Sequence, residues 1–164
     1  MTDASPPAAL TAVDRAHLAL VTTLAAAPTF AEQRVRMGEV IGDDLDDDGV
    51  TKRWLNVLIA PGPPIILDEM MGLGEGLSVV EYIQVFHIEW LVQRDNAAAR
   101  TQAFQAGLLA ISGALSADRK LGGAARGLTV GGPDRESNSM PFTATTMSAV
   151  IPIRVQLRGS DPLT

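Results

Sequence analysis

The alternation of apolar and polar side chains is sharpest between residues 82 and 93, and it predicts a half-buried β-strand. The apolar face of this strand holds Tyr82, Phe86, Ile88, Trp90 and Val92, with Gln84 as an exception. The polar face holds Glu81, His87, Glu89 and Gln93. Because successive side chains of a strand point to opposite faces, we expect one face to cover a core and the other to be polar.

A helix is predicted directly after this strand, over residues 96–117. Asp95 or Asn96 can accept hydrogen bonds from the free N–H groups of its first turn. Residues that can face the core then recur at intervals of three and four: Ala97, Thr101, Phe104, Leu108, Ile111 and Leu115. Gly122 and Gly123 can adopt the left-handed conformation that ends a helix. We therefore expect the helix to lie back across the strand.

An amino-terminal helix is predicted over residues 10–27, ending before Pro28. One stripe of this helix holds Leu10, Val13, His17, Leu20 and Leu24. His17 is interpreted as a partly buried histidine with a backbone or solvent partner, because the pattern supplies no converging catalytic groups. Residues 1–9 are predicted to form a flexible arm.

Shorter strands are predicted over residues 35–41, 53–60, 65–71 and 128–131. The final strand alternates most regularly, with Met147, Ala149, Ile151, Ile153, Val155 and Leu157 on its apolar face. Pro152 cannot donate a backbone hydrogen bond, which predicts a sheet edge or a bulge in that strand. Residues 72–76 are interpreted as a flexible hairpin connection, and the polar residues 132–145 as a contact arm.

These elements predict an α+β fold, in which two main helices pack on one face of a mostly antiparallel sheet. The other face of the sheet is expected to be more polar. Residues 10–160 are expected to form a single domain. The predicted core includes Leu20, Leu24, Phe86, Trp90, Phe104, Leu108, Ile111 and Ile153.

Composition narrows the possible functions. The 164 residues include 13 basic and 19 acidic side chains, a formal net charge of −6, and they show no basic stripe of the kind that nucleic-acid binders carry. Cysteine is absent, which excludes disulfides, thiolate metal sites and cysteine nucleophiles. No apolar run approaches the roughly 18 residues of a membrane-spanning helix, so no membrane partner is expected.

A run of carboxylates between residues 43 and 49 invites a calcium hypothesis. Asp44, Asp46, Asp48 and Gly49 match the first positions of an EF-hand loop. The last position falls on Leu55, where a bidentate glutamate is needed, so a solvated acidic loop that repels or steers a partner is the preferred interpretation. No metal site and no cofactor are predicted.

Candidate catalytic groups are few, and we expect no enzyme. Glu81, His87 and Glu89 would have to converge under a loop to form a site. The preferred interpretation is pairing across strands with Arg154 and Arg158, if the final strand lies beside the central one.

The order of these elements resembles the tail terminator, or tail completion, proteins of long-tailed bacteriophages and gene transfer agents. The resemblance rests on the helix over residues 10–27, the strand over 82–93 that precedes Arg94-Asp95, the helix over 96–117, the turn over 118–123 that closes in leucine and glycine, and the final strand over 148–157. The acidic run and the 132–145 loop depart from the family pattern.

The resemblance implies a structural virion protein without a catalytic site, assembled in the host cytoplasm and located at the junction of tail and neck. Such proteins form a ring, expected here to be a hexamer, that caps the tail tube, ends its polymerisation and contacts the neck or head-closure protein. DNA would pass through the lumen without specific binding. A neck protein and a tail-tube subunit are the alternatives within the virion class, and a small-molecule enzyme is a more distant one.

Two sets of residues are the site candidates under this resemblance. Acidic side chains expected at the lumen or the tube-facing rim are Asp43, Asp44, Asp46, Asp47 and Asp48. Residues expected at subunit or partner interfaces are Arg135, Glu136, Arg154 and Arg158.

Overall fold

The computed structural model describes residues 10–42, 44–71, 78–135 and 143–159. The helices are α1 (Ala12–Ala25) and α2 (Ala97–Ala117), with short 3-10 turns η1 (Pro28–Phe30) and η2 (Leu121–Gly123). The strands are β1 (Val35–Met37), β2 (Asp46–Asp47), β3 (Lys52–Ile59), β4 (Ile65–Met71), β5 (Ser78–Gln93), β6 (Gly127–Val130) and β7 (Thr146–Gly159). No helix within the described ranges is long and apolar enough to cross a membrane.

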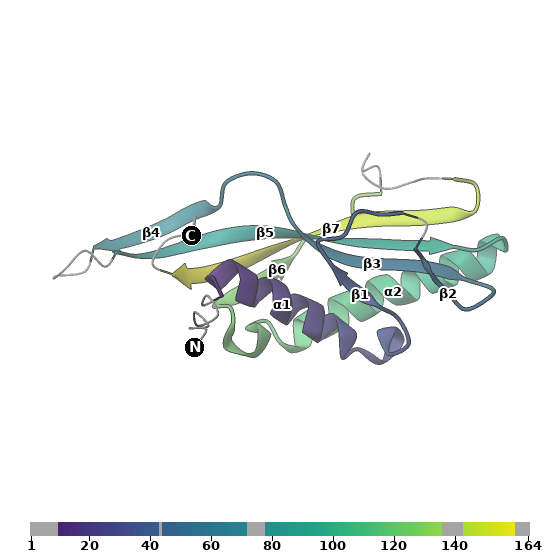
Figure 1. Cartoon of the computed structure of the whole chain (residues 1–164), viewed down its shortest axis with the longest axis horizontal. Coiled ribbons are helices and arrows are strands. Elements are labelled where there is room, and N and C mark those ends of the chain that lie inside the picture. The colour runs from purple at the N-terminus through teal and green to yellow at the C-terminus, as the bar shows by residue number, and fades with distance from the viewer. Residues whose placement is uncertain (1–9, 43, 72–77, 136–142, 160–164) are drawn as a thin grey trace, which may run out of the picture.

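Strand β5, with 16 residues, is the central strand of a seven-stranded sheet (Figure 1). β7 pairs with it antiparallel over 14 consecutive positions, from Val80↔Gly159 to Gln93↔Thr146. Along its other edge, β4 pairs with the first part of β5 and β3 with the last part. Among the strands of the described ranges, only β1 runs parallel to its neighbour, β3, so the predicted mostly antiparallel α+β fold is confirmed.

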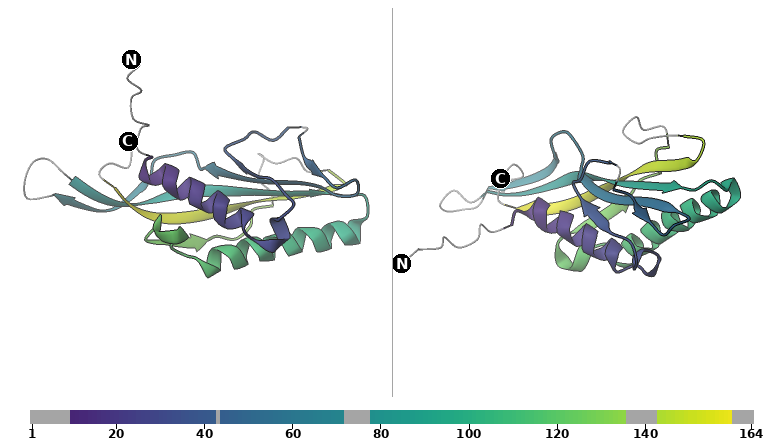
Figure 2. Two further views of the ribbon diagram at one scale, coloured as in Figure 1. Left: turned by 60° about the horizontal axis from the view of Figure 1, so that its bottom comes forward. Right: turned by 45° about the vertical axis from the view of Figure 1, so that its right-hand side comes forward.

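Both helices cover the same face of the sheet, as the alternation predicted (Figure 2). Thr11 and Asp14 form a capping box at the start of α1, which satisfies N–H groups that lack partners within the helix. Asn96 accepts a hydrogen bond of 2.9 Å from the N–H of Ala99 and caps α2, so one of its two proposed caps is confirmed. The chain turns after α2 with positive φ angles at Leu121, Gly122 and Gly123.

The core between helices and sheet contains the predicted residues. Seven of the eight are buried, and Leu108 is partly buried against them. Trp90 of β5 donates a hydrogen bond of 3.0 Å from Nε1 to the carbonyl oxygen of Phe104. A Cβ atom at Gly107 would lie 2.3 Å from the Trp90 ring, so α2 can approach β5 this closely only because position 107 is glycine.

The opposite face of the sheet also carries buried apolar side chains. Trp54, Leu91 and Val150 are buried there in a second, smaller cluster, and Ile41 and Leu45 pack against it. Ile41 and Leu45 lie in the segment between β1 and β2. Acidic residues dominate the sequence there, so its apolar side chains were not recognised as part of a core. The second face therefore holds a small apolar cluster beside buried polar residues that include Asn56 and Glu89.

The expectation that Pro152 marks a sheet edge also needs correction, because β7 lies between β5 and β6. The last ladder pair of β6 is Val130↔Ile153, and an isolated bridge joins Asp134 to Val150. Pro152 lies opposite the interruption between them, where its carbonyl accepts from the N–H of Gly131 at 2.8 Å. A missing donor is tolerated inside the sheet because the neighbouring strand is interrupted there.

Candidate functional site

The acidic run forms a short strand beside basic residues. β2 pairs with β3 in the register Asp46↔Arg53 and Asp47↔Lys52. The Asp47 carboxylate lies 3.8 Å from Lys52 Nζ, and the Asp48 carboxylate lies 3.2 Å from Arg53 Nη2. These carboxylates are therefore partly neutralised within the chain, which the sequence pattern did not indicate.

Arg36 holds this acidic segment against the sheet. Its side chain is only 1% exposed, and its guanidinium lies 3.0 Å from a carboxylate oxygen of Asp46. Nη2 donates to the backbone carbonyl oxygen of Asp44 at 2.6 Å. The guanidinium carbon lies 4.3 Å from the centre of the Trp54 ring, a cation–π contact. Sequence analysis missed Arg36, which is the middle residue of β1.

Asp48 caps the turn after β2. Its carboxylate accepts hydrogen bonds from the N–H groups of Thr51 at 2.7 Å and Val50 at 3.0 Å. These two backbone hydrogen bonds lower the pKa of Asp48, with a smaller contribution from the nearby charge of Arg53.

Among the described residues, no group of three or more histidine and carboxylate side chains could hold a metal ion.

Glu81, His87 and Glu89 are separated along β5 rather than brought together. Glu81 and Glu89 are eight residues apart in one strand, about 26 Å. Glu89 is buried and accepts hydrogen bonds from Trp54 Nε1 at 3.2 Å and Asn56 Nδ2 at 3.1 Å. His87 lies opposite Pro152 in the ladder with β7.

The other histidine, His17 of α1, is buried and donates a hydrogen bond of 2.7 Å from Nε2 to the carbonyl oxygen of Val57. This confirms the prediction of a buried histidine with a backbone partner.

The final strand lies beside β5, as the predicted charge pairing required, but among the described residues no ion pair joins Glu81 to Arg154 or Arg158. Arg158 lies opposite Glu81, but Arg154 lies opposite Val85. The Glu81 carboxylate makes its ion pair with Arg126 instead, at 3.9 Å.

The interface candidates lie apart from one another. Arg154 and Arg158 are exposed on β7. Arg135 is exposed after β6, with its guanidinium carbon 5.5 Å from the centre of the Phe104 ring. Glu136 and Asp43 lie outside the described residues. The two sets of site residues therefore remain predictions.

Arg158 also belongs to a basic hollow of about 410 Å³, which we define by Arg15, Lys120, Arg126 and Arg158. These residues come from the start of α1, the turn after α2, the approach to β6 and the end of β7. Sequence analysis found no basic cluster because the four residues come from three separate regions of the chain, at position 15, at positions 120 and 126, and at position 158.

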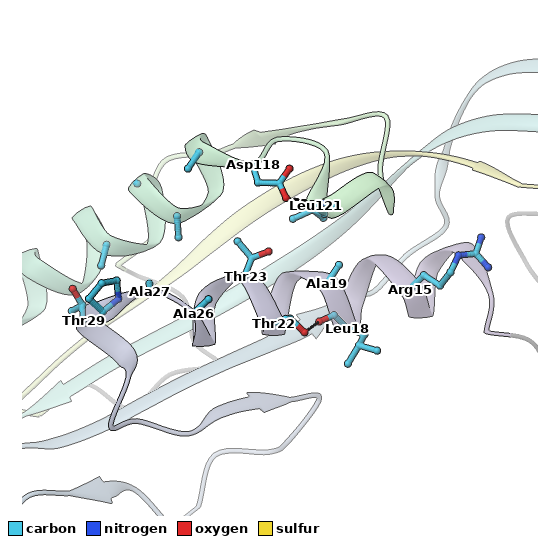
Figure 3. A pocket seen from close by; sticks show the side chains of 16 residues that line it. Arg15, Leu18, Ala19, Thr22, Thr23, Ala26, Ala27, Thr29, Asp118 and Leu121 are labelled. Atoms are coloured by element: carbon cyan, nitrogen blue, oxygen red, sulfur yellow. Dashed lines mark hydrogen bonds between the residues drawn. The ribbon is translucent and has the colours of Figure 1, made fainter.

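A wider groove of about 830 Å³ separates α1 from α2 (Figure 3). Its α1 side is formed by small side chains that include Ala19, Thr23 and Ala26, and Leu121 lies across from them (Figure 3). The small side chains leave the space between the helices incompletely filled.

Comparison with known proteins gives likenesses among solved structures alone. No protein-family model matches the chain, and no curated protein matches it at a significant level. Among solved structures, a chain described as "Virion of native gene transfer agent (GTA) particle" is similar at 19% identity and a TM-score of 0.49. The match covers 87% of this chain and 94% of that chain. At this identity and TM-score, the likeness assigns no function.

Proposed function

We propose that this chain is a structural virion protein that forms a ring on the end of a tail tube, ends tube polymerisation and contacts the neck or head. The observation that carries the proposal is the order of elements: α1, four short strands, the long β5, α2, the leucine-glycine turn at η2 and the closing β7. That order is the basis of the resemblance to tail terminator proteins. The solved chain of similar fold comes from a gene transfer agent virion, although that likeness carries no weight of its own.

The sheet offers an edge suited to assembly. β4 pairs with β5 along one edge only, and together with the first part of β5 it extends beyond the two helices (Figure 1). Ile65, Ile66 and Leu67 on this strand are all about half exposed. An apolar edge strand with free backbone groups readily adds a strand from another chain. β4 therefore supports a role in which contacts with other virion subunits complete the sheet.

The acidic residues are proposed to lie at the lumen or the tube-facing rim. Asp44 is 79% exposed, and the pKa of Asp48 is lowered by its backbone hydrogen bonds, so negative charge persists on this surface despite the ion pairs. Negative charge facing the lumen would repel DNA phosphates and oppose binding during passage. Neutralising the five aspartates to asparagine is expected to slow DNA ejection, and unchanged ring docking and ejection would contradict the placement.

The function is tested by the partner that the protein selects. The full chain is sedimented separately with purified tail tubes and with DNA-filled heads. A terminator is expected to co-sediment with tubes, and its binding should saturate when each tube end carries one ring of subunits. Binding to filled heads alone would identify a neck protein instead, and self-assembly into long polymers would identify a tube subunit.

A further inference from the structure

The basic hollow gathers positive charge in a chain whose net charge is −6. Lys120 and Arg158 form no side-chain hydrogen bond or ion pair within the described part of the chain. The only carboxylate within 4.0 Å of the hollow's four cations, among described residues, is Glu81, which lies 3.9 Å from Arg126. Four cations around one hollow repel one another, and an anionic partner relieves that repulsion.

The opposite end of the molecule carries the complementary charge. Residues 32–53 contain seven carboxylates and four cations. Asp44, Asp47 and Asp48 have exposed side chains within this acid-rich end. In Figure 1, β2 lies toward the right along the long axis, whereas α1 begins and β7 ends toward the left, where the basic hollow lies. One chain therefore presents opposite charges at two separate ends.

We propose that the basic hollow receives the acid-rich end of a second copy of this chain. The inference rests on the proposed ring, and it identifies the surfaces through which neighbouring subunits meet. For Asp44 and Asp47 it replaces the placement at the lumen or rim with a place in the contact between subunits. A contact between two different surfaces of identical subunits is heterologous, and such contacts close into rings when the rotation between subunits permits. Charge complementarity fixes the orientation of each subunit against the next and disfavours contact between like ends.

The charge distribution favours a second copy over DNA as the occupant. Proteins that follow a nucleic-acid backbone carry a basic stripe, whereas these four cations surround a single hollow of about 410 Å³. The same chain also carries exposed carboxylates at Asp44, Asp47 and Asp48. A contact between subunits gives a role both to the basic hollow and to the exposed carboxylates, whereas DNA binding would give a role to the hollow alone.

A charge-exchange experiment on the full chain tests the contact. One variant carries Lys120→Glu and Arg158→Glu in the hollow, and the other carries Asp44→Lys and Asp47→Lys in the acid-rich end. We expect each variant alone to weaken ring assembly at least about tenfold, because like charges then face each other. An equimolar mixture should restore assembly in rings where the two variants alternate. The reversed hollow then meets the reversed acid-rich end, and the unreversed hollow meets the unreversed acid-rich end. Light scattering measures the assembled fraction.

Two controls separate charge from folding. Arg119→Glu reverses an exposed cation that does not line the hollow, and it should leave assembly unchanged. Lys120→Gln with Arg158→Gln removes the charge without adding carboxylates, and it should weaken assembly less than the glutamate pair. A cooperative thermal unfolding transition should show that every variant is folded at the temperature of the assembly measurement. If the glutamate pair fails to fold, the glutamine pair still tests the hollow.

The inference is overturned if the hollow variants assemble like the unmodified chain or if the mixture fails to restore assembly. Loss of binding to a double-stranded oligonucleotide, with assembly intact, would assign the hollow to DNA and overturn it equally. Rings that form on tube ends with the hollow neutralised would contradict this contact and leave the proposed function standing. An unmodified chain that never forms rings, even on tubes, would contradict the proposed function itself.

Discussion

The guanidinium of Arg36 stacks 4.3 Å from the centre of the Trp54 ring, on the face of the sheet opposite the helices. Because the same guanidinium binds the Asp46 carboxylate and the Asp44 carbonyl oxygen, it joins the acidic segment to the sheet. The acidic run is therefore a structured surface held by a buried cation.

Replacing Arg36 with methionine should destabilise the protein. The loss is expected to be about 3 kcal/mol, near the lower end for removing one partner of a buried pair, because Asp46 keeps some contact with water. Chemical denaturation measures the change. Arg34→Met is the matched control, since Arg34 is exposed and its ion pairs with Glu39 and Asp44 should contribute less than about 1 kcal/mol. Equal losses for the two variants would contradict the anchoring role of Arg36.

Gly107→Ala should destabilise the packing of α2 on β5. The new methyl group would overlap the Trp90 ring, and overpacking of this kind costs about 1–3 kcal/mol. Gly113→Ala, in the same helix, meets nothing within 4 Å and should instead stabilise the protein by about 0.5–1 kcal/mol. Thermal unfolding of the two variants should shift in opposite directions, and a shared direction would contradict the packing described.

Phe104→Ala should remove a large part of the core between α2 and the sheet. Phe104 is fully buried, so truncation is expected to cost about 3–5 kcal/mol. Leu109→Ala, on the exposed side of the same helix, should change the free energy of unfolding by less than about 0.5 kcal/mol. A small loss at Phe104 would mean that α2 does not pack on β5 as described.

Asp48 should contribute an acid-sensitive part of the stability. Its folded-state pKa lies below its ordinary value of 3.8, because Thr51 and Val50 donate backbone hydrogen bonds to the carboxylate. The unfolded chain therefore binds this proton first, and the contribution of Asp48 is lost as pH falls through the folded pKa. Asp48→Asn should flatten the decline in stability below about pH 4. Denaturation at a series of pH values measures this slope, and an unchanged slope would contradict the hydrogen-bonding role.

The periodicity of apolar residues along the sequence was sufficient to predict the main helices and strands and most of the core residues. Trp90 and Phe104 were predicted because strand and helix periodicity depends on neighbouring residues alone. Arg36 was missed because its burial depends on Trp54 and Asp46, which are separated from it in sequence. The basic hollow was missed for the same reason, since its residues span positions 15 to 158. Contacts of this kind follow from tertiary packing, and they are the ones on which the proposed interfaces depend.

Light scattering of the purified chain, followed by negative-stain imaging with isolated tail tubes, tests the proposed function most directly. We expect closed rings, either free in solution or formed at one end of each tube. A persistent monomer that does not bind tubes would contradict the terminator role.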